Sequence, residues 1–511
     1  MARSGGCVAL LMFGLAAGCV GVDPKPDYAR VSRVVGERTG FSEVYDPLGD
    51  ESVAGKVADL LREPLTVDDA VQVALLNNPS FQAGFAAVGA SRADVVQSAL
   101  FTNPSVSFGL AFPDAGGRSR LTAGLAQQIS DLWQIPIRKK IAEAELERTL
   151  LATARRGIEL VADVKTRCYR LLAVQQSEAM LGEGRALAER AARLAEAQLA
   201  AGEVNQLDVS LARAALLDVE LELRTVQRER RSAEIDMARV LGVGRVPEPW
   251  TLADQLPAPQ IALPDEADLI AAALLQRLDA RAALLAVSAA EDELVHQYLR
   301  AFPELALGVD LERVEERALP GRRILADTVR SSIGAGKLTA PSIQSRGERR
   351  IEKAQIINTV LGPSLTVTLP LWDQNQAQVA KAGYVVGQRR KELEDVLDTI
   401  ASEVQQAVAT ARNAWSLVQV YEQQALPQAE ENVAAALRLY RDGEQSILVV
   451  LDAQESLLRR RRSYIEARRD YAIALAALEQ SLAGRVVALL ESPPAPTMAP
   501  AVPLSAPEDS R

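Results

Sequence analysis

The sequence has few of the side chains on which enzymes and metal proteins depend. Among its 511 residues there is one histidine, His296, and the three cysteines lack zinc-type spacing, so a multi-histidine or zinc site is excluded. Neither a glycine-rich phosphate loop nor a nucleophile–base constellation is present, which argues against an enzyme and predicts no cofactor. The net charge of −10 disfavours nucleic acid as a partner, because nucleic-acid binding normally needs a basic face.

Aromatic residues are also scarce, at 4% of the chain, while alanine, leucine, arginine, glutamate and glutamine dominate its middle. That composition is typical of long helices and coiled coils. Between residues 137 and 201 there is no proline, and apolar residues recur at helical spacing. A single helix of that length would extend for about 100 Å at ~1.5 Å per residue. Such a helix does not fit a small globular domain.

The N-terminus has the layout of a secretory signal. An apolar run over residues 8–17 follows Arg3 and is too short to span a bilayer as a helix. It ends in Ala-Ala-Gly-Cys19, which resembles the lipobox of bacterial lipoproteins, whose cysteine is acylated and becomes the mature N-terminus. We therefore expect residues 1–19 to be a signal peptide with lipidation at Cys19. Ala16 occupies the place of the usual large aliphatic residue, so ordinary signal cleavage nearby is the alternative.

A glycine-centred break separates two long helical patterns in the second half of the chain. It reads Tyr440-Arg-Asp-Gly443-Glu-Gln-Ser-Ile-Leu-Val-Val-Leu-Asp452, and we interpret it as the tip of a helical hairpin. A second copy, Gly202-Glu-Val-Asn-Gln-Leu-Asp208, lies 241 positions earlier, counted from Gly443 back to Gly202. Two tips in register, with Gly202 and Gly443 as their turn residues, indicate an internally duplicated chain.

Shorter helical patterns repeat as well, because Ala273 and Pro303 follow Ala74 and Pro104 by 199 positions. We expect a first repeat over residues 65–242, with strands at about 103–130, a helical hairpin at about 137–241 and a tip near 202. The second repeat is expected over residues 264–484, with strands at about 303–371, a hairpin at about 374–483 and a tip near 443. The remaining parts are an irregular N-terminal segment (20–64), a proline-rich linker (243–263) and a proline-rich tail (485–511) that is expected to be disordered.

Each repeat contains two runs in which apolar residues alternate with small or polar ones, which is the period of a strand. The clearest run alternates Val106, Phe108 and Leu110 with serine and glycine. In the second repeat, residues 316–358 are expected to form a long exposed loop between the strands. A short helix over residues 347–357 is the alternative.

Four strands with one apolar face suit a transmembrane barrel. Four strands cannot close, and lipid does not tolerate an open sheet edge, so the chain must associate at least as a dimer. Trp133 and Trp372 stand near the ends of the strand pairs and fit a membrane interface. A soluble sheet is the alternative for each feature taken alone.

Together these features resemble the TolC-like outer-membrane efflux proteins, over about residues 65–484. The residues that carry the resemblance are Asn78-Pro79, Asn103-Pro104, Gly362-Pro-Ser-Leu-Thr-Val-Thr-Leu-Pro-Leu-Trp372-Asp, residues 440–454, Tyr464 and Asp470-Tyr471. The resemblance implies a mainly α fold with a transmembrane β-barrel. In that fold three identical chains form a twelve-strand β-barrel in the outer membrane, continued by a twelve-helix α-barrel across the periplasm.

The resemblance also implies a function without catalysis, the outer-membrane exit duct of a tripartite efflux pump. Its partners would be a periplasmic adaptor protein, an inner-membrane transporter of the resistance–nodulation–division type and outer-membrane lipid. The transporter selects the cargo in such pumps, so a drug, a metal ion or a protein stays open as the cargo. A type I secretion duct is the nearest alternative. A periplasmic coiled-coil adaptor or scaffold lipoprotein is an alternative of another class, but it would have one hairpin flanked by compact β domains.

By resemblance, the helical tips form the periplasmic gate. Asp452 matches an aspartate ring that filters cations, Asp208 matches an aspartate that locks the closed gate, and Tyr440 matches the tyrosine partner of that lock. Val449 and Gln445 depart from the family pattern, which has an aspartate and an arginine there, so a simpler or hydrophobic gate is expected. The alternative is that Asp208 and Asp452 only cap the helices that follow each tip.

Overall fold

The structure is a computed structural model of the whole chain. It describes residues 21–41, 43–112, 119–202, 204–244, 250–257, 264–317, 333–334, 336, 355–442 and 444–484. The predicted signal with Cys19, the tip residue Gly443 and the predicted tail from residue 485 therefore lie outside the described residues. Two compact units are present. The strand unit comprises Asp94–Glu143 and Ala289–Gly387, and the helical unit comprises the other described residues.

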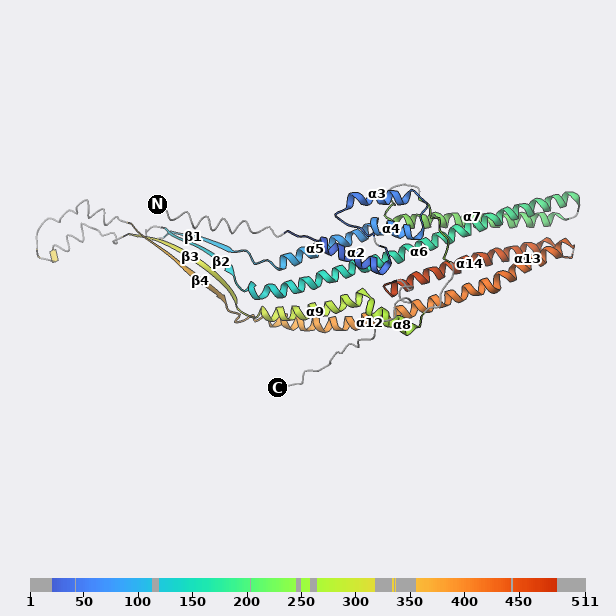
Figure 1. Cartoon of the computed structure of the whole chain (residues 1–511). Helices are drawn as coiled ribbons and strands as arrows, with labels where there is room; N and C mark the ends of the chain where they lie inside the picture. The colour runs from blue at the N-terminus through green and yellow to red at the C-terminus, as the bar shows by residue number, and fades with distance from the viewer. Residues whose placement is uncertain are drawn as a thin grey trace. The chain divides into compact units, whose positions relative to one another are not determined.

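The N-terminal segment is helical, so the expectation of an irregular segment is wrong. It forms α2 (Lys25–Thr39) and α3 (Asp50–Leu61) (Figure 1). Pro24 precedes α2, and Gly40 ends it in a left-handed conformation at φ 83°. Val31 and Val35, one turn apart, are 1% and 0% exposed. Only a narrow stripe of α2 is buried, and the surrounding charged residues conceal the helical spacing of its apolar residues in the sequence.

Each repeat begins with two short helices separated by a sharp break. The first pair is α4 (Val67–Asn77) and α5 (Pro79–Ser98), and the second is α8 (Glu266–Gln276) and α9 (Leu278–Leu299). The Thr66 side chain caps α4 by accepting a hydrogen bond from the backbone N–H of Asp69. Pro79 is the first residue of α5, a position that suits proline because it needs no N–H donor there.

The first hairpin consists of α6 (Asp131–Ala201) and α7 (Gln206–Val240), which lie side by side in Figure 1. α6 has 71 residues and begins six residues before the predicted start. Trp133 is therefore in the first turn of a helix and not at the end of a strand. Pro136 lies within this helix, where it removes one backbone hydrogen bond near the N-terminus.

The second hairpin is interrupted on its first arm. α12 (Gln376–Val420) passes into a π-helical turn, η2 (Tyr421–Ala425), before α13 (Leu426–Arg441) and the returning α14 (Ile447–Ser481). Pro427 has no N–H and its ring crowds the carbonyl four residues earlier, so the wider π turn absorbs the mismatch. The interruption of this arm therefore lies immediately before Pro427. Tyr464 Oη reaches across from α14 and donates to Glu422 Oε1 at 2.5 Å.

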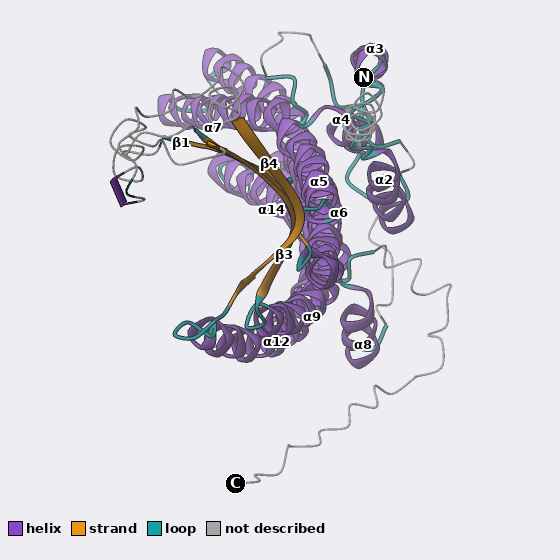
Figure 2. Cartoon of the chain, turned by 90° about the vertical axis from the view of Figure 1, so that its left-hand side faces the viewer, coloured by secondary structure: helices purple, strands orange, loops and turns teal. Residues whose placement is uncertain are grey.

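Four antiparallel strands form one sheet in the order β1 (Ser105–Ala111), β2 (Arg120–Gln128), β3 (Glu304–Arg317) and β4 (Gln355–Thr368) (Figure 2, orange). β2 pairs with β3, so the sheet joins both repeats. The last pair is longer than predicted. The expected loop over residues 316–358 is wrong at both ends, because β3 continues to Arg317 and β4 already begins at Gln355. In β4, adjacent Ile356 and Ile357 conceal the alternation that identifies strands in the sequence. The alternative helix over residues 347–357 is wrong at residues 355–357, because these residues belong to β4.

Matching contacts in the helical unit support the internal duplication. Asn78 and Arg277 occupy equivalent breaks between the short helices, 199 positions apart. Asn78 Nδ2 donates to the carbonyl of Val240 at 2.9 Å, and Arg277 Nη1 donates to the carbonyl of Ser481 at 3.4 Å. The two acceptors are themselves 241 positions apart, at the ends of α7 and α14. Each repeat thus fastens its short helices to the end of its own hairpin.

Neither unit contains, within the described residues, a helix that is both long enough and apolar enough to cross a membrane.

Candidate functional site

The two faces of the sheet differ in chemistry, because successive residues of a strand point to opposite sides. On one face the aligned rows are apolar: Val106, Leu125, Val309 and Pro363 form one row, and Phe108, Ala123, Leu311 and Leu361 form the next. Several of these side chains are largely exposed, including Phe108 at 76% and Leu361 at 67%. A contiguous exposed apolar surface of this kind marks contact with lipid or with another protein.

The opposite face, called the polar face below, is built from small and polar residues. Its central row is Ser107, Gly124, Asp310 and Gly362, and the next row is Gly109, Thr122, Glu312 and Val360. Arg120 extends from the strand beside Glu312 and forms an ion pair with it at 2.7 Å. The sheet therefore has one exposed apolar face and one face of small and polar residues.

Both edges of this sheet are open within the described residues, since β1 and β4 each pair on one side only. Trp372, predicted at a membrane interface, follows β4 in a loop and is 91% exposed. Trp133 is half-buried in the first turn of α6. Both tryptophans belong to the strand unit, so they remain compatible with an interfacial position, although only Trp372 extends freely into solvent.

At the first helical tip, Gly202 makes the turn with φ 78°, a conformation that favours glycine. The side chain of Asn205 then accepts hydrogen bonds from the N–H groups of Leu207 and Asp208. Asp208 Oδ2 in turn accepts from the Asn205 N–H at 3.2 Å, which completes a capping box on α7. The capping interpretation of Asp208 therefore has direct geometric support.

Asp452 at the second tip is in a different situation. α14 begins after Ser446, so Asp452 lies beyond its first turn, where no free N–H group needs a cap. Its side chain is exposed and forms no hydrogen bond or ion pair with any described residue. Capping does not explain Asp452, whereas a role that requires an exposed carboxylate stays open to it. Val449, one turn earlier on α14, is 38% exposed.

Tyr440 connects the two hairpins, but through a residue that the sequence did not indicate. Its hydroxyl donates to Gln198 Oε1 on α6 at 2.8 Å, whereas the Asp208 carboxylate accepts from the N–H of Asn205. Two further ties follow along the hairpins: Arg462 on α14 pairs with Glu222 on α7, and Lys165 on α6 pairs with Glu479 on α14 at 2.6 Å. Nothing in the spacing of Gln198 pointed to this contact, since only the packing of the hairpins creates it.

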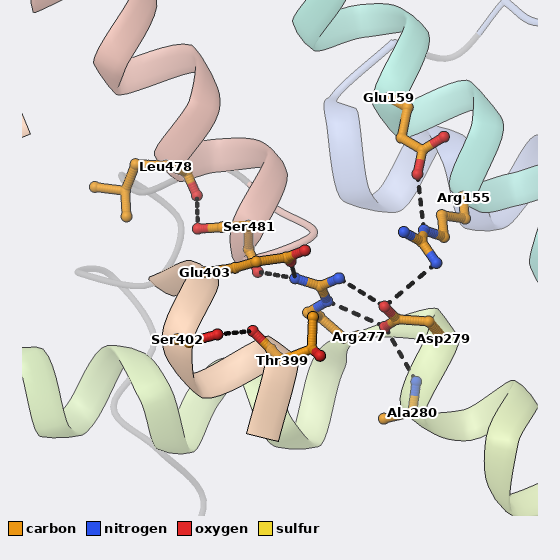
Figure 3. Close-up of polar contacts among 10 residues, drawn as sticks. All are labelled: Arg155, Glu159, Arg277, Asp279, Ala280, Thr399, Ser402, Glu403, Leu478 and Ser481. Atoms are coloured by element: carbon orange, nitrogen blue, oxygen red, sulfur yellow. Dashed lines mark hydrogen bonds and ion pairs between the residues drawn. The ribbon is translucent and has the colours of Figure 1, made fainter. Parts of the chain in front are cut away.

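A charge cluster around the buried side chain of Arg277 lies at the base of the second hairpin (Figure 3). The Arg277 side chain is 7% exposed and donates to both carboxylate oxygens of Asp279, at 3.0 and 2.6 Å, and to Glu403 on α12. Arg155 on α6 approaches Asp279 from the other side at 3.4 Å. Burial alone would raise the pKa of Asp279, but the hydrogen bonds and charge of Arg277 outweigh it and hold that pKa below its usual value. Every charge has a partner, so the cluster stabilises the packing of α6, α9, α12 and α14.

Comparison with known proteins agrees with this geometry. A sequence model of the family described as outer membrane efflux protein matches residues 70–243 and 269–484. No curated protein sequence matches the chain.

Among solved structures, the outer-membrane channel OprN is 18% identical, with 88% of this chain and 95% of that chain covered at a TM-score of 0.64. The Campylobacter jejuni CmeC outer membrane channel is 15% identical, with 82% and 85% covered at 0.63. The open state of the Neisseria gonorrhoeae MtrE outer membrane channel is 16% identical, with 82% and 89% covered at 0.58. At these identities the structures establish the shared fold.

Proposed function

Since the chain belongs to the outer membrane efflux protein family, we propose that it is the outer-membrane exit duct of a tripartite efflux pump. The observation that carries this proposal is the two-faced sheet, whose strands continue directly into two long helical hairpins. The exposed apolar face suits lipid, and the polar face suits a water-filled passage. The hairpins would carry that passage onward through the periplasm.

The open edges of the sheet support a closed oligomer. One chain supplies four strands, and a bilayer tolerates no unpaired sheet edge. We propose a homotrimer, in which twelve strands close a β-barrel and six hairpins form a twelve-helix α-barrel. Closure alone requires at least two chains, and the family resemblance favours three.

The proposed partners contact the two ends of this duct, proteins at the helical tips and lipid at the sheet. A periplasmic adaptor would bind at the helical tips, where Leu207 and Leu448 are 64% and 52% exposed, and would connect them to an inner-membrane transporter of the resistance–nodulation–division type. In the outer membrane the apolar face of the sheet would contact lipid. An acyl chain on Cys19 would add a second attachment to the membrane.

The tips are proposed to form the periplasmic gate. Exposed Asp452 would contribute one carboxylate per chain to a ring that attracts cations, and Val449, one turn away, would make the neighbouring part of the gate apolar. In the lock, Tyr440 with Gln198 would hold one hairpin against the other. Asp208 would support the lock indirectly, by capping α7.

A pair of matched substitutions tests the proposal. Phe108→Asp places a charge in the exposed apolar face, and Ser107→Asp places the same charge one residue away on the polar face. An aspartate facing lipid is costly whereas one facing water is tolerated, so only Phe108→Asp should abolish the oligomer in outer-membrane fractions. Equal behaviour of the two variants would refute a lipid-facing sheet and with it the duct.

A further inference from the structure

One carboxylate on the polar face stands apart from the others. Asp310 lies in the middle of β3, level with the apolar rows of the opposite face, and its side chain is exposed. Its partners in the same row are Gly124 on β2 and Gly362 on β4, neither of which has a side chain to cover it. Asp310 forms no hydrogen bond or ion pair with any other described residue.

The carboxylate of Asp310 lies beside Gly124 of the neighbouring strand. A Cβ atom added to Gly124 would come within 2.5 Å of Asp310 Oδ1 and 2.6 Å of Ser107 Oγ. The carboxylate therefore occupies the space above Gly124, with the Ser107 hydroxyl beside it. The absence of a side chain at this position keeps the carboxylate against the sheet yet open to solvent.

Other charged groups on the polar face do not share this environment. Glu312, two residues further along β3, is neutralised by Arg120 at 2.7 Å. Glu304 shares the face but stands at the first residue of β3, outside the apolar rows. Within the described strands, Asp310 is thus the charged residue of the polar face that lies level with the apolar rows of the opposite face and has no partner of opposite charge.

We propose that Asp310 makes the membrane-spanning part of the duct selective for cations. This inference rests on the proposed function, because it requires the polar face to line a closed passage. One Asp310 from each chain then forms a ring of negative charge in the lumen, separate from the Asp452 position at the tips. Such a ring raises the local concentration of small cations and cationic solutes and lowers that of anions.

The test is the reversal potential of single channels in a potassium chloride gradient at low salt. At about 0.01 M the Debye length is about 30 Å, so a ring of carboxylates acts across much of the lumen. The wild-type channel should prefer potassium, and Asp310→Asn should lower the potassium-to-chloride permeability ratio at least about twofold. Arg120→Gln frees Glu312 and should raise the ratio. Thr366→Ala, a neutral change on the same face, should leave it unchanged.

Each outcome decides one part of the argument. Conducting Asp310→Asn channels with the wild-type permeability ratio would overturn the role of Asp310 and leave the duct intact. Wild-type protein that forms no channels would overturn both the duct and this inference. Asp310→Ser provides a second neutral variant, and the oligomer mass of every variant shows whether its assembly is intact.

Discussion

The first repeat joins its two short helices through Asn78 and Pro79, whereas the second repeat has Arg277 and Leu278 at the matching positions. In the first, a neutral amide donates to the end of α7, and proline sets the helix start. In the second, a buried guanidinium donates to the end of α14, and its charge requires acidic partners. The same architectural joint is thus made by two different chemistries, one neutral and one ionic.

A second difference lies at the ends of the hairpins. Gly242 after α7 and Ala483 after α14 are 241 positions apart, and both adopt a left-handed conformation, with φ 76° and φ 50°. Glycine adopts this conformation without strain, but alanine does not. The first joint therefore uses the residue that its backbone requires, and the second tolerates a strained residue beside its ionic cluster.

The largest expected effect comes from breaking the ionic joint. Arg277→Met leaves Asp279 and Glu403 without their main partner, and losing one member of a buried ion pair costs about 3–5 kcal/mol. Asn78→Ala should cost only about 1–2 kcal/mol, since it removes two neutral hydrogen bonds, one to the Val240 carbonyl and one from the Phe81 N–H. Thermal unfolding of the two variants, followed by circular dichroism, compares the joints directly. An equal loss of stability in the two variants would mean that the charge cluster stabilises its repeat no more than the neutral hydrogen bonds of Asn78 stabilise theirs.

Gly242→Ala should also be strongly destabilising. Besides the strained φ, its Cβ would approach the carbonyl oxygen of Asn77 within 2.3 Å, which the backbone cannot accommodate without shifting. Strain and overpacking together should cost about 2–4 kcal/mol. The reverse change in the other repeat, Ala483→Gly, should relieve strain and raise stability by up to about 1 kcal/mol. Gly242→Ala should therefore lower the melting temperature and Ala483→Gly should raise it. A change of the same sign in both variants would contradict the role given to the left-handed backbone conformation.

Acid should distinguish the two joints. The pKa of Asp279 is held below its unfolded value, so the stability it contributes is full above the unfolded pKa and is lost as pH falls through the folded pKa. Asp279→Asn should therefore lower the melting temperature at neutral pH and have progressively less effect in acid. Asn78→Ala should have the same effect at every pH, because an amide does not titrate. A pH-independent effect of Asp279→Asn would rule out this linkage.

The smallest expected effect concerns the contact between the hairpins. Tyr440→Phe removes one partly exposed hydrogen bond, to Gln198, which costs about 1 kcal/mol. Stability should change little, but the tip should open more often if the bond holds the gate closed. More frequent spontaneous opening in single-channel records is the expected readout, with Tyr298→Phe on α9, in the strand unit, as a control.

Periodicity predicted the strands and long helices because their patterns extend over many residues. Val106, Phe108 and Leu110 could hardly be anything other than one face of a strand. Local patterns failed where the period was narrow or interrupted, as in α2, where only Val31 and Val35 are deeply buried, and at Ile356 in β4.

The site was less predictable, since its contacts depend on residues distant in the sequence. The pairing of Arg277 with Glu403 and of Tyr440 with Gln198 needs the packed hairpins. The alternation of β3 places Asp310 on the polar face, but only the strand register shows that glycines flank it. The cap of α4, by contrast, is a local contact, because Thr66 accepts from the backbone N–H of Asp69, only three residues later.

The central claim is that three chains form a channel. Recording currents across lipid bilayers from protein separated by the mass of its native oligomers tests that claim most directly. We expect discrete conductance steps from the fraction whose mass corresponds to three chains. A preparation that is monomeric in mild detergent, or a three-chain fraction that never conducts, would contradict the account.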